Sequence, residues 1–194
     1  NSKYVDINKD GVYNDADQGI IGCGQPTFNW GWNNTFNYKN FDFSFFVVGF
    51  HGFDIYNATH QMGYNLIKSQ QVAGVTPMRE LLNRWTPTNT NTNIPGFVNG
   101  GTENKDFFST RFVENGSFIK MKSITLGYTL PETACRALGI TNLRVYASVQ
   151  NPFHITNYSG LDPEATMGSP LVQGVDWGSY PNSRNYLIGL NFSF

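Results

Sequence analysis

A run of oxygen-bearing side chains near the start of the chain has the spacing of a calcium-binding loop. Asp or Asn stands at the first, third and fifth positions of this run, and Gly11 follows at the sixth. Calcium binds hard oxygen donors at such positions, and glycine lets the backbone turn sharply between them. Asp17 stands where an EF-hand loop has glutamate, whose longer side chain reaches bidentate geometry more easily. The spacing predicts either a metal-free Asn/Asp/Gly turn or a calcium site with the candidate ligands Asp6, Asn8, Asp10, Asp17 and the backbone carbonyl of Val12.

No arrangement of nucleophilic, basic or metal-binding side chains points to catalysis. His51, His60 and His154 lack the spacing of metal ligands, and the sequence has no nucleotide-binding or nucleophile-elbow motif. Asp162 and Glu164 are close together, but a carboxylate pair in a proline-containing loop is more often structural than an acid–base pair. We therefore expect a protein that is not an enzyme and that has no organic cofactor.

The composition favours an all-β protein. Of the 194 residues, only 14% are charged while 15% are aromatic, and 20 are glycine. The formal net charge of −1 removes the electrostatic reason to expect a nucleic-acid-binding protein. No uninterrupted apolar stretch approaches the ~18–20 residues of a transmembrane helix.

Five stretches alternate apolar and polar residues with the period of a β-strand. In the last stretch, 186–194, every second residue from Tyr186 to Phe194 is apolar. The other stretches cover residues 27–38, 41–52, 123–130 and 143–150. Their apolar faces are rich in Trp, Phe and Tyr, which is typical of the aromatic girdles of transmembrane barrels.

The connections between these stretches alternate in length, short at 39–40 and 131–141 and long at 53–112 and 152–183. This is the layout of an outer-membrane barrel, with periplasmic turns and extracellular loops. Five strands cannot close a barrel that needs at least ~8, so we expect the remaining strands to precede Asn1. The alternative is a secreted, calcium-stabilised β-sandwich that binds carbohydrate through surface Trp and Tyr.

One short helix is expected inside the first long connection. Thr76 and Pro77 have the character of an N-cap and a first helical residue. Apolar residues then recur at helical spacing until Pro87, at positions Met78, Leu81, Leu82 and Trp85.

The order of motifs along the chain resembles the C-terminal part of SusC/RagA-type TonB-dependent transporters of the Bacteroidetes outer membrane. Each motif alone is weak, but their order and spacing together are specific, and they run over nearly the whole chain. They are the calcium-like loop, NYKNFDFS at 37–44, GFHGFDIYN at 49–57, RFVENGSFIK at 111–120, ITLGYTLP at 124–131, VYASVQNPF at 145–153, YSGLDPE at 158–164 and the terminal Phe194.

This resemblance implies a transmembrane barrel of about 22 antiparallel strands, of which these are the last five. It further implies import of a glycan oligomer or a peptide through the outer membrane of a Gram-negative bacterium. A SusD-like surface lipoprotein would be the partner, and the TonB complex would supply energy through a plug domain. The plug and the TonB box are absent from this chain.

The resemblance also orients the chain in the membrane. It implies an extracellular loop at 1–25, a hairpin at 26–52, a long extracellular loop at 53–112, two strands with a periplasmic turn at 113–151, an extracellular loop at 152–183 and a terminal strand at 184–194. The aromatic residues expected to face lipid are Phe28, Trp30, Trp32, Phe36, Tyr128, Tyr186, Phe192 and Phe194. The wall residues expected to face the lumen are Thr27, Asn29, Asn33, Thr35, Arg144, Ser148, Gln150, Asn191 and Ser193.

Overall fold

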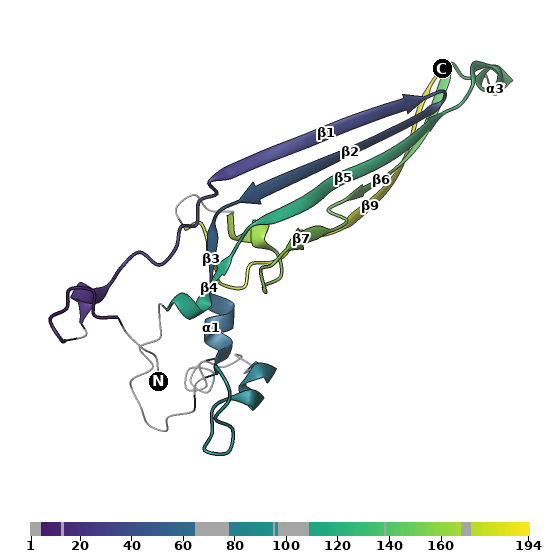
Figure 1. The fold of residues 1–194 in the computed structure, drawn as a ribbon. Helices are drawn as coiled ribbons and strands as arrows, with labels where there is room; N and C mark the ends of the chain where they lie inside the picture. The colour runs from purple at the N-terminus through teal and green to yellow at the C-terminus, as the bar shows by residue number, and fades with distance from the viewer. Residues whose placement is uncertain are drawn as a thin grey trace.

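A long, curved antiparallel sheet extends from a cluster of loops (Figure 1). The computed structural model describes residues 5–12, 14–64, 78–94, 96, 109–137, 139–167 and 172–194. Within them the five long strands follow the order β1-β2-β5-β6-β9, and the short β7 pairs with β5. The strands are β1 (Phe28–Tyr38), β2 (Phe41–His51), β5 (Phe118–Thr129), β6 (Asn142–Gln150), β7 (His154–Thr156) and β9 (Asn185–Ser193). The expectation of five long antiparallel strands is confirmed.

The short and long connections lie at opposite ends of this sheet (Figure 1). The β1–β2 turn is made by Lys39 and Asn40, and Lys39 has a positive φ of 52°. The β5–β6 connection lies at the same end as the C-terminus and contains the helix α3 (Glu132–Ala137), where the sequence analysis expected only a turn. We call the end of the sheet with the short connections the turn end, and the opposite end the loop end.

A small second sheet forms at the loop end. Its order is β4-β3-β8, with β4 (Val113–Asn115), β3 (Asp54–Asn57) and β8 (Val175–Asp176), and β3 and β8 are parallel. The helix α1 (Ala58–Tyr64) follows β3 directly. Short 3₁₀ helices complete the described loops: η1 (Asp15–Asp17), η2 (Arg79–Asn83), η3 (Thr110–Phe112) and η4 (Pro163–Met167). None of the helices in the described part of the chain is long and apolar enough to cross a membrane.

The helix expected after Thr76 and Pro77 is only partly testable, because both residues lie outside the described ones. From Met78 onward the chain forms the 3₁₀ helix η2, not an α-helical segment. Its apolar residues do not share one buried face, since Leu81 is 6% exposed while Leu82 is 79% exposed. The helix α1, in the same long connection, was not expected from the sequence.

The buried core lies at the loop end, outside the main body of the long sheet. One cluster contains Phe53, Ile55, Phe118 and Tyr158, and a second contains Tyr56, Ala58 and Phe112. The long strands instead expose large apolar side chains, including Phe36 at 55%, Tyr186 at 72% and Ile188 at 84%. A β-sandwich would cover such a face with a second sheet, and no described strand does so, which argues against the sandwich alternative.

Candidate functional site

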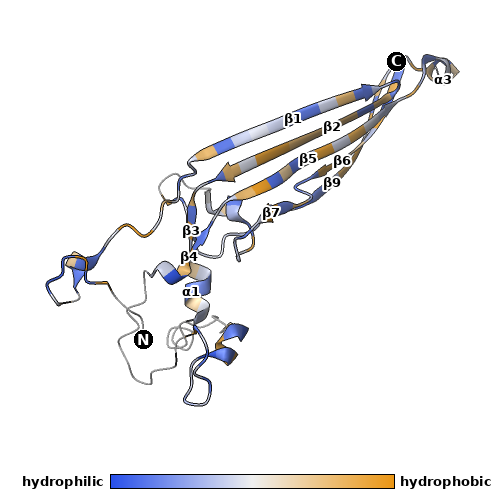
Figure 2. Ribbon diagram, viewed as in Figure 1, coloured by the Kyte–Doolittle hydropathy of each residue, from blue (hydrophilic) through white to orange (hydrophobic). Residues whose placement is uncertain are grey.

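The strand register sorts the side chains of the long sheet into two chemically different faces. One row across the sheet pairs Phe36, Phe43, Leu126, Ala147 and Ile188, and the adjacent row pairs Thr35, Ser44, Thr125, Ser148 and Leu187. Directly paired residues point to the same side, so the first row belongs to an apolar face and the second to a polar face. The bands of hydropathy along the strands are visible in Figure 2.

All the predicted wall and lipid residues follow this division. By register and strand alternation, the aromatic set lies on the apolar face, and Phe194 packs edge-to-face on Phe192 one residue beyond β9. The polar set lies on the polar face, and Thr27, just before β1, donates its hydroxyl to the carbonyl of Gly52 at 2.9 Å. That these faces meet lipid and lumen stays a prediction.

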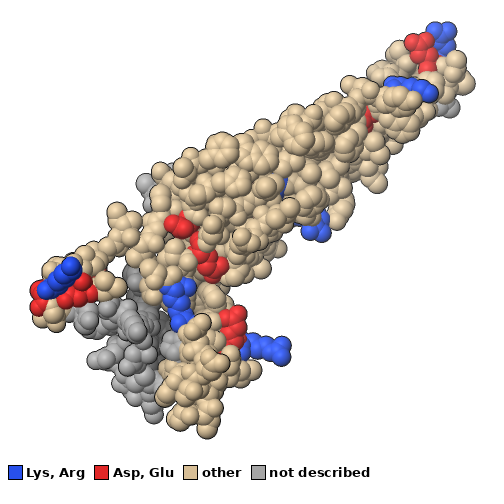
Figure 3. Space-filling view, in the orientation of Figure 1, with Lys and Arg blue, Asp and Glu red and all other residues tan. Residues whose placement is uncertain are grey.

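Charged side chains are scarce along the sheet and gather mostly towards its two ends (Figure 3). On the polar face near the turn end, Arg144 donates from both Nε and Nη2 to the carboxylate of Asp42. This pair lies across Gly127, where a Cβ would come within 2.3 Å of Asp42 Oδ1. The charge of Arg144 is therefore neutralised within the sheet. Asp42 was not among the predicted wall residues, although its place between Phe41 and Phe43 signals the polar face.

On the apolar face near the loop end, Trp30 lies flat across Gly49. A Cβ at position 49 would come within 2.3 Å of the indole ring, so only glycine permits this arrangement. The indole N–H donates to His51 Nε2 at 3.2 Å, and His51 stacks on Phe28. The result is an aromatic group with a satisfied polar atom, which is typical of side chains at a membrane–water interface.

A β-bulge in β5 changes which residues face the polar side. Phe46 pairs with Ser123 but Val47 pairs with Met121, so Lys122 is the extra residue. Beyond the bulge, Lys120 pairs with Val48 and shares the polar face. Sequence reasoning missed both lysines because the bulge breaks the simple alternation within 118–129.

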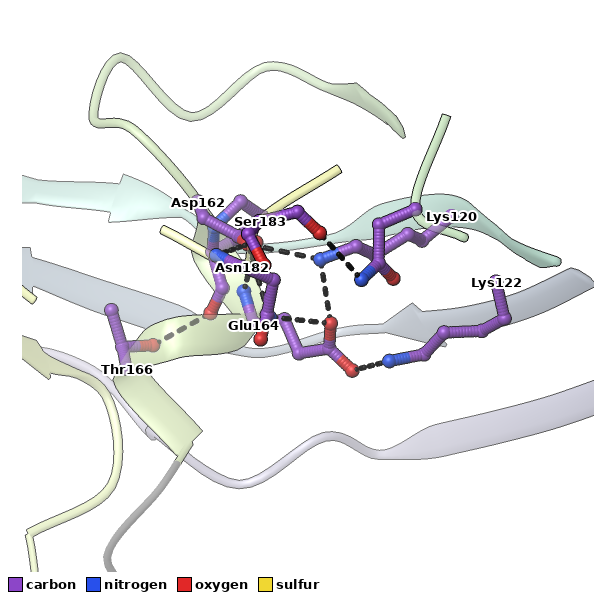
Figure 4. A network of polar contacts seen from close by, with 9 residues as sticks. Lys120, Lys122, Asp162, Glu164, Thr166, Asn182 and Ser183 are labelled. Atoms are coloured by element: carbon purple, nitrogen blue, oxygen red, sulfur yellow. Dashed lines mark hydrogen bonds and ion pairs between the residues drawn. The ribbon is translucent and has the colours of Figure 1, made fainter. Parts of the chain in front are cut away.

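Lys120 and Lys122 anchor a loop between β7 and β9, here called the anchored loop (residues 157–167 and 172–183). Lys120 Nζ lies 2.9 Å from Asp162 Oδ2 and 2.6 Å from Glu164 Oε2, and Lys122 pairs with the other oxygen of Glu164. Lys120 is only 2% exposed. Figure 4 shows these side chains meeting from β5 and from the loop.

The second limb of the anchored loop joins the same network. Asn182 donates from its backbone N–H and from Nδ2 to Asp162 Oδ2, each at 3.1 Å. Burial alone would raise the pKa of Asp162, but hydrogen bonds from Lys120 and Asn182 hold it below its usual value. The two carboxylates that an enzyme could have used as an acid–base pair are thus engaged in holding the loop.

Two further contacts tie the anchored loop together and to the small sheet. The hydroxyl of Tyr158, in the first limb, donates at 2.6 Å to Oδ2 of Asp176, which lies in the second limb as part of β8 and pairs with β3. Burial with this carboxylate raises the pKa of the phenol, which therefore stays protonated. Glu114 in β4 accepts hydrogen bonds from the backbone N–H and the hydroxyl of Ser159, both at 2.8 Å. The loop is therefore held at several points along its length.

The candidate calcium ligands do gather in one loop at the start of the chain. Asp6 accepts from the N–H groups of Asp10 and Gly11, and Asn8 Nδ2 lies 2.9 Å from Asp10 Oδ2. Asp17 folds back to accept from the N–H of Ile7 at 2.9 Å. Backbone hydrogen bonds, chiefly from Asn14, lower the pKa of Asp17. Val12 donates its N–H to Asp10 Oδ1 at 2.8 Å.

These hydrogen bonds would also stabilise a turn that holds no metal, because each carboxylate already accepts from backbone N–H groups. Within the described ranges, no three His, Cys, Asp or Glu side chains are grouped closely enough to hold a metal. Calcium would also draw on the Asn8 amide oxygen and the Val12 carbonyl, so the donor chemistry fits the ion. Calcium binding here stays a prediction.

The chain is similar to several known proteins over nearly its whole length. It is 35% identical to TonB-dependent receptor P3 of Formosa agariphila over 98% of this chain and 19% of that receptor. It is 30% identical to TonB-dependent receptor SusC of Bacteroides thetaiotaomicron over 98% of this chain and 17% of that receptor. No family model matches the sequence.

Solved structures give the same picture. The RagAB peptide importer in its closed-closed state superposes with a TM-score of 0.74 and 27% identity, over 90% of this chain and 18% of that chain. In the open-open state the TM-score is 0.70, over 88% of this chain. The chain thus spans about a fifth of the length of the curated relatives described above.

Proposed function

This chain belongs to the SusC/RagA-type TonB-dependent receptors, as a C-terminal portion of their barrel, and we propose that it serves import across the outer membrane. Its role in that import is to form part of the barrel wall and the loops at its mouth. It carries out no chemical step of its own. The remainder of the barrel and the plug domain complete the receptor, and the TonB complex supplies the energy.

The observation that carries this proposal is the two-faced sheet. The apolar face exposes Leu126 at 50%, Leu190 at 60% and Phe192 at 59%, which water disfavours and a bilayer accommodates. The opposite face presents hydroxyl and amide groups that can exchange hydrogen bonds with a hydrated solute. Closing this sheet into a barrel with further strands would turn the apolar face towards lipid and the polar face towards water.

The polar face favours an uncharged, hydrogen-bonding solute. Its predicted lumen residues are Asn, Thr, Ser and Gln apart from Arg144, whose charge Asp42 neutralises. We propose a glycan oligomer as the substrate, with a peptide as the alternative that the RagAB peptide importer suggests. A SusD-like surface lipoprotein is the proposed partner, and the cell outer membrane of a Bacteroidetes bacterium the proposed location.

Uptake by cells that express the complete receptor tests this function. Labelled glycan oligomers and labelled peptides are offered separately to cells with and without the receptor, and to cells with and without TonB. The proposal expects accumulation of glycan oligomers that depends both on the receptor and on TonB. Accumulation of peptides alone would change the substrate class, and uptake that is unaffected by loss of the receptor would contradict the import function.

A further inference from the structure

The anchored loop packs against the polar face of the long sheet. Tyr158 is buried together with Phe118 and Phe53, and Phe50 packs against this cluster. Phe50 and Phe118 pair in register, and they lie on the same side of the strands as Val48 and Lys120. The polar face therefore changes from open and hydrophilic at the turn end to covered at the loop end.

Both limbs of the loop join the network around the same buried cation. Asp162 and Glu164 approach Lys120 from the first limb, and Asn182 joins their oxygens from the second. Lys120 belongs to β5, a central strand of the sheet, so the anchor is as rigid as the wall itself. A surface loop held only by exposed contacts would open readily, whereas this one must separate buried charges to move.

We propose that the anchored loop is the size-limiting element at the mouth of the receptor, and that Lys120 is the residue that fixes it there. The inference rests on the proposed function, in which the polar face lines the lumen. A loop that covers this face reduces the cross-section through which a solute enters. The position is set by the wall, since the anchor is part of β5.

The anchor selects by cross-section and not by charge. Lys120 and Lys122 contribute two positive charges, and Asp162 and Glu164 contribute two negative charges at contact distance. The network is therefore close to neutral, and it neither repels nor attracts ions strongly. Extended neutral oligomers pass more easily than branched ones of the same mass.

Reporter cysteines in the complete receptor test this inference on intact cells. Thr125, on the polar face of β5 nearer the turn end, is replaced by cysteine after the exposed Cys23 has been replaced by serine. A small methanethiosulfonate and a large polyethylene-glycol maleimide are added from outside. In the native loop the small reagent reacts at Thr125→Cys and the large one does not. In Lys120→Met, reaction with the large reagent rises by roughly a hundredfold, as expected when a buried ion pair is broken.

Two controls make the labelling specific. Tyr180→Cys, at a position that is 89% exposed on the anchored loop, reacts with both reagents in every variant. Arg136→Met removes an exposed pair with Glu132 at the turn end and leaves the labelling of Thr125→Cys unchanged. If Lys120→Met does not assemble, Lys120→Met combined with Asp162→Asn relieves the uncompensated carboxylate but still removes the ion pairs that hold the loop, so reaction with the large reagent should still rise, by less than a hundredfold.

The labelling and the uptake assay fail independently. The size-limiting role of the loop is overturned if, at Thr125→Cys, reaction with the large reagent relative to the small one is the same in the native and the Lys120-substituted receptors. The same conclusion holds if neither reagent reacts in either receptor. If the native receptor shows the expected labelling pattern but no TonB-dependent uptake, the import function is contradicted and the size-limiting role of the loop is not.

Discussion

Replacing Lys120 with methionine leaves Asp162 and Glu164 without their shared cation. The side chains of Lys120 and Asp162 are 2% and 3% exposed, so water cannot readily replace the lost contact. Removing one partner of such a buried pair costs about 3–5 kcal/mol, and a tenfold change in an equilibrium corresponds to about 1.4 kcal/mol. Lys122 still pairs with Glu164, which favours the lower part of this range. We therefore expect the loop-opening equilibrium to rise by roughly a hundredfold.

Amide hydrogen exchange in the complete, detergent-solubilised receptor measures this change directly. The N–H groups of Glu164 and Asn182 both donate to the Asp162 carboxylate, so they report on the anchor. Their exchange should accelerate by roughly a hundredfold in Lys120→Met. The ladder amides between β1 and β2 should not change.

A matched variant separates the buried anchor from a general effect of losing a cation. Arg136 pairs with Glu132 at 3.4 Å, with side chains 81% and 84% exposed, and such pairs contribute less than about 1 kcal/mol. Arg136→Met should leave the loop amides unchanged. Acceleration of less than about tenfold in Lys120→Met, or acceleration spread evenly over the sheet, would refute the account of the anchor.

Three further predictions follow from the two faces of the sheet, the Lys120 anchor and the calcium-like loop at the start of the chain. Leu126→Arg on the apolar face should lower barrel stability, by about 2–4 kcal/mol for an arginine at the depth of the bilayer midplane, and reduce the fraction of folded barrel on unheated gels. Thr125→Arg on the polar face should be tolerated, and equal losses of folded barrel in the two variants would contradict the division of faces. Because the pKa of Asp162 lies below its ordinary value of 3.8, its stabilisation is present above that pH and is lost as the pH falls through the lowered value. The protection factor of the Asn182 amide, which corrects for the pH dependence of intrinsic exchange, should therefore be constant down to about pH 4 and fall below it. Asp10→Asn should weaken terbium luminescence and calcium protection of residues 5–17 from proteolysis, while the neighbouring Asp15→Asn should not; a complete receptor that gives no terbium signal would exclude a calcium site there.

Sequence alternation was sufficient to predict the strands and their faces because each long strand keeps one period over most of its length. Tyr186 to Phe194 shows this most clearly, and the pairing of β6 with β9 keeps that period unbroken. The anchor at Lys120 escaped prediction for a physical reason. The bulge at Lys122 changes the phase of β5, and the partners Asp162 and Asn182 are distant in sequence.

The helices were the least predictable elements. Residues 58–64 form α1 although they carry no strong helix signal, and its burial against the small sheet stabilises it. Met78, Leu81 and Leu82 had helical spacing, yet the chain there forms only η2. Local propensity is a weak guide where a loop packs against its surroundings.

The central claim is that the apolar face of this sheet meets lipid while the polar face meets water, and β9 offers the most direct test. Nitroxide labels are placed singly from 186 to 192 in the complete receptor in bilayers, and their collisions with oxygen and with a water-soluble nickel complex are measured. Labels at Tyr186, Ile188, Leu190 and Phe192 should collide mainly with oxygen, and labels at Leu187 and Asn191 mainly with nickel. Gly189 is left unlabelled, because a Cβ there would come within 2.3 Å of the Tyr146 ring. The account predicts this period of two. Uniform access of nickel to both sets, or exclusion of both reagents from the apolar set, would contradict it.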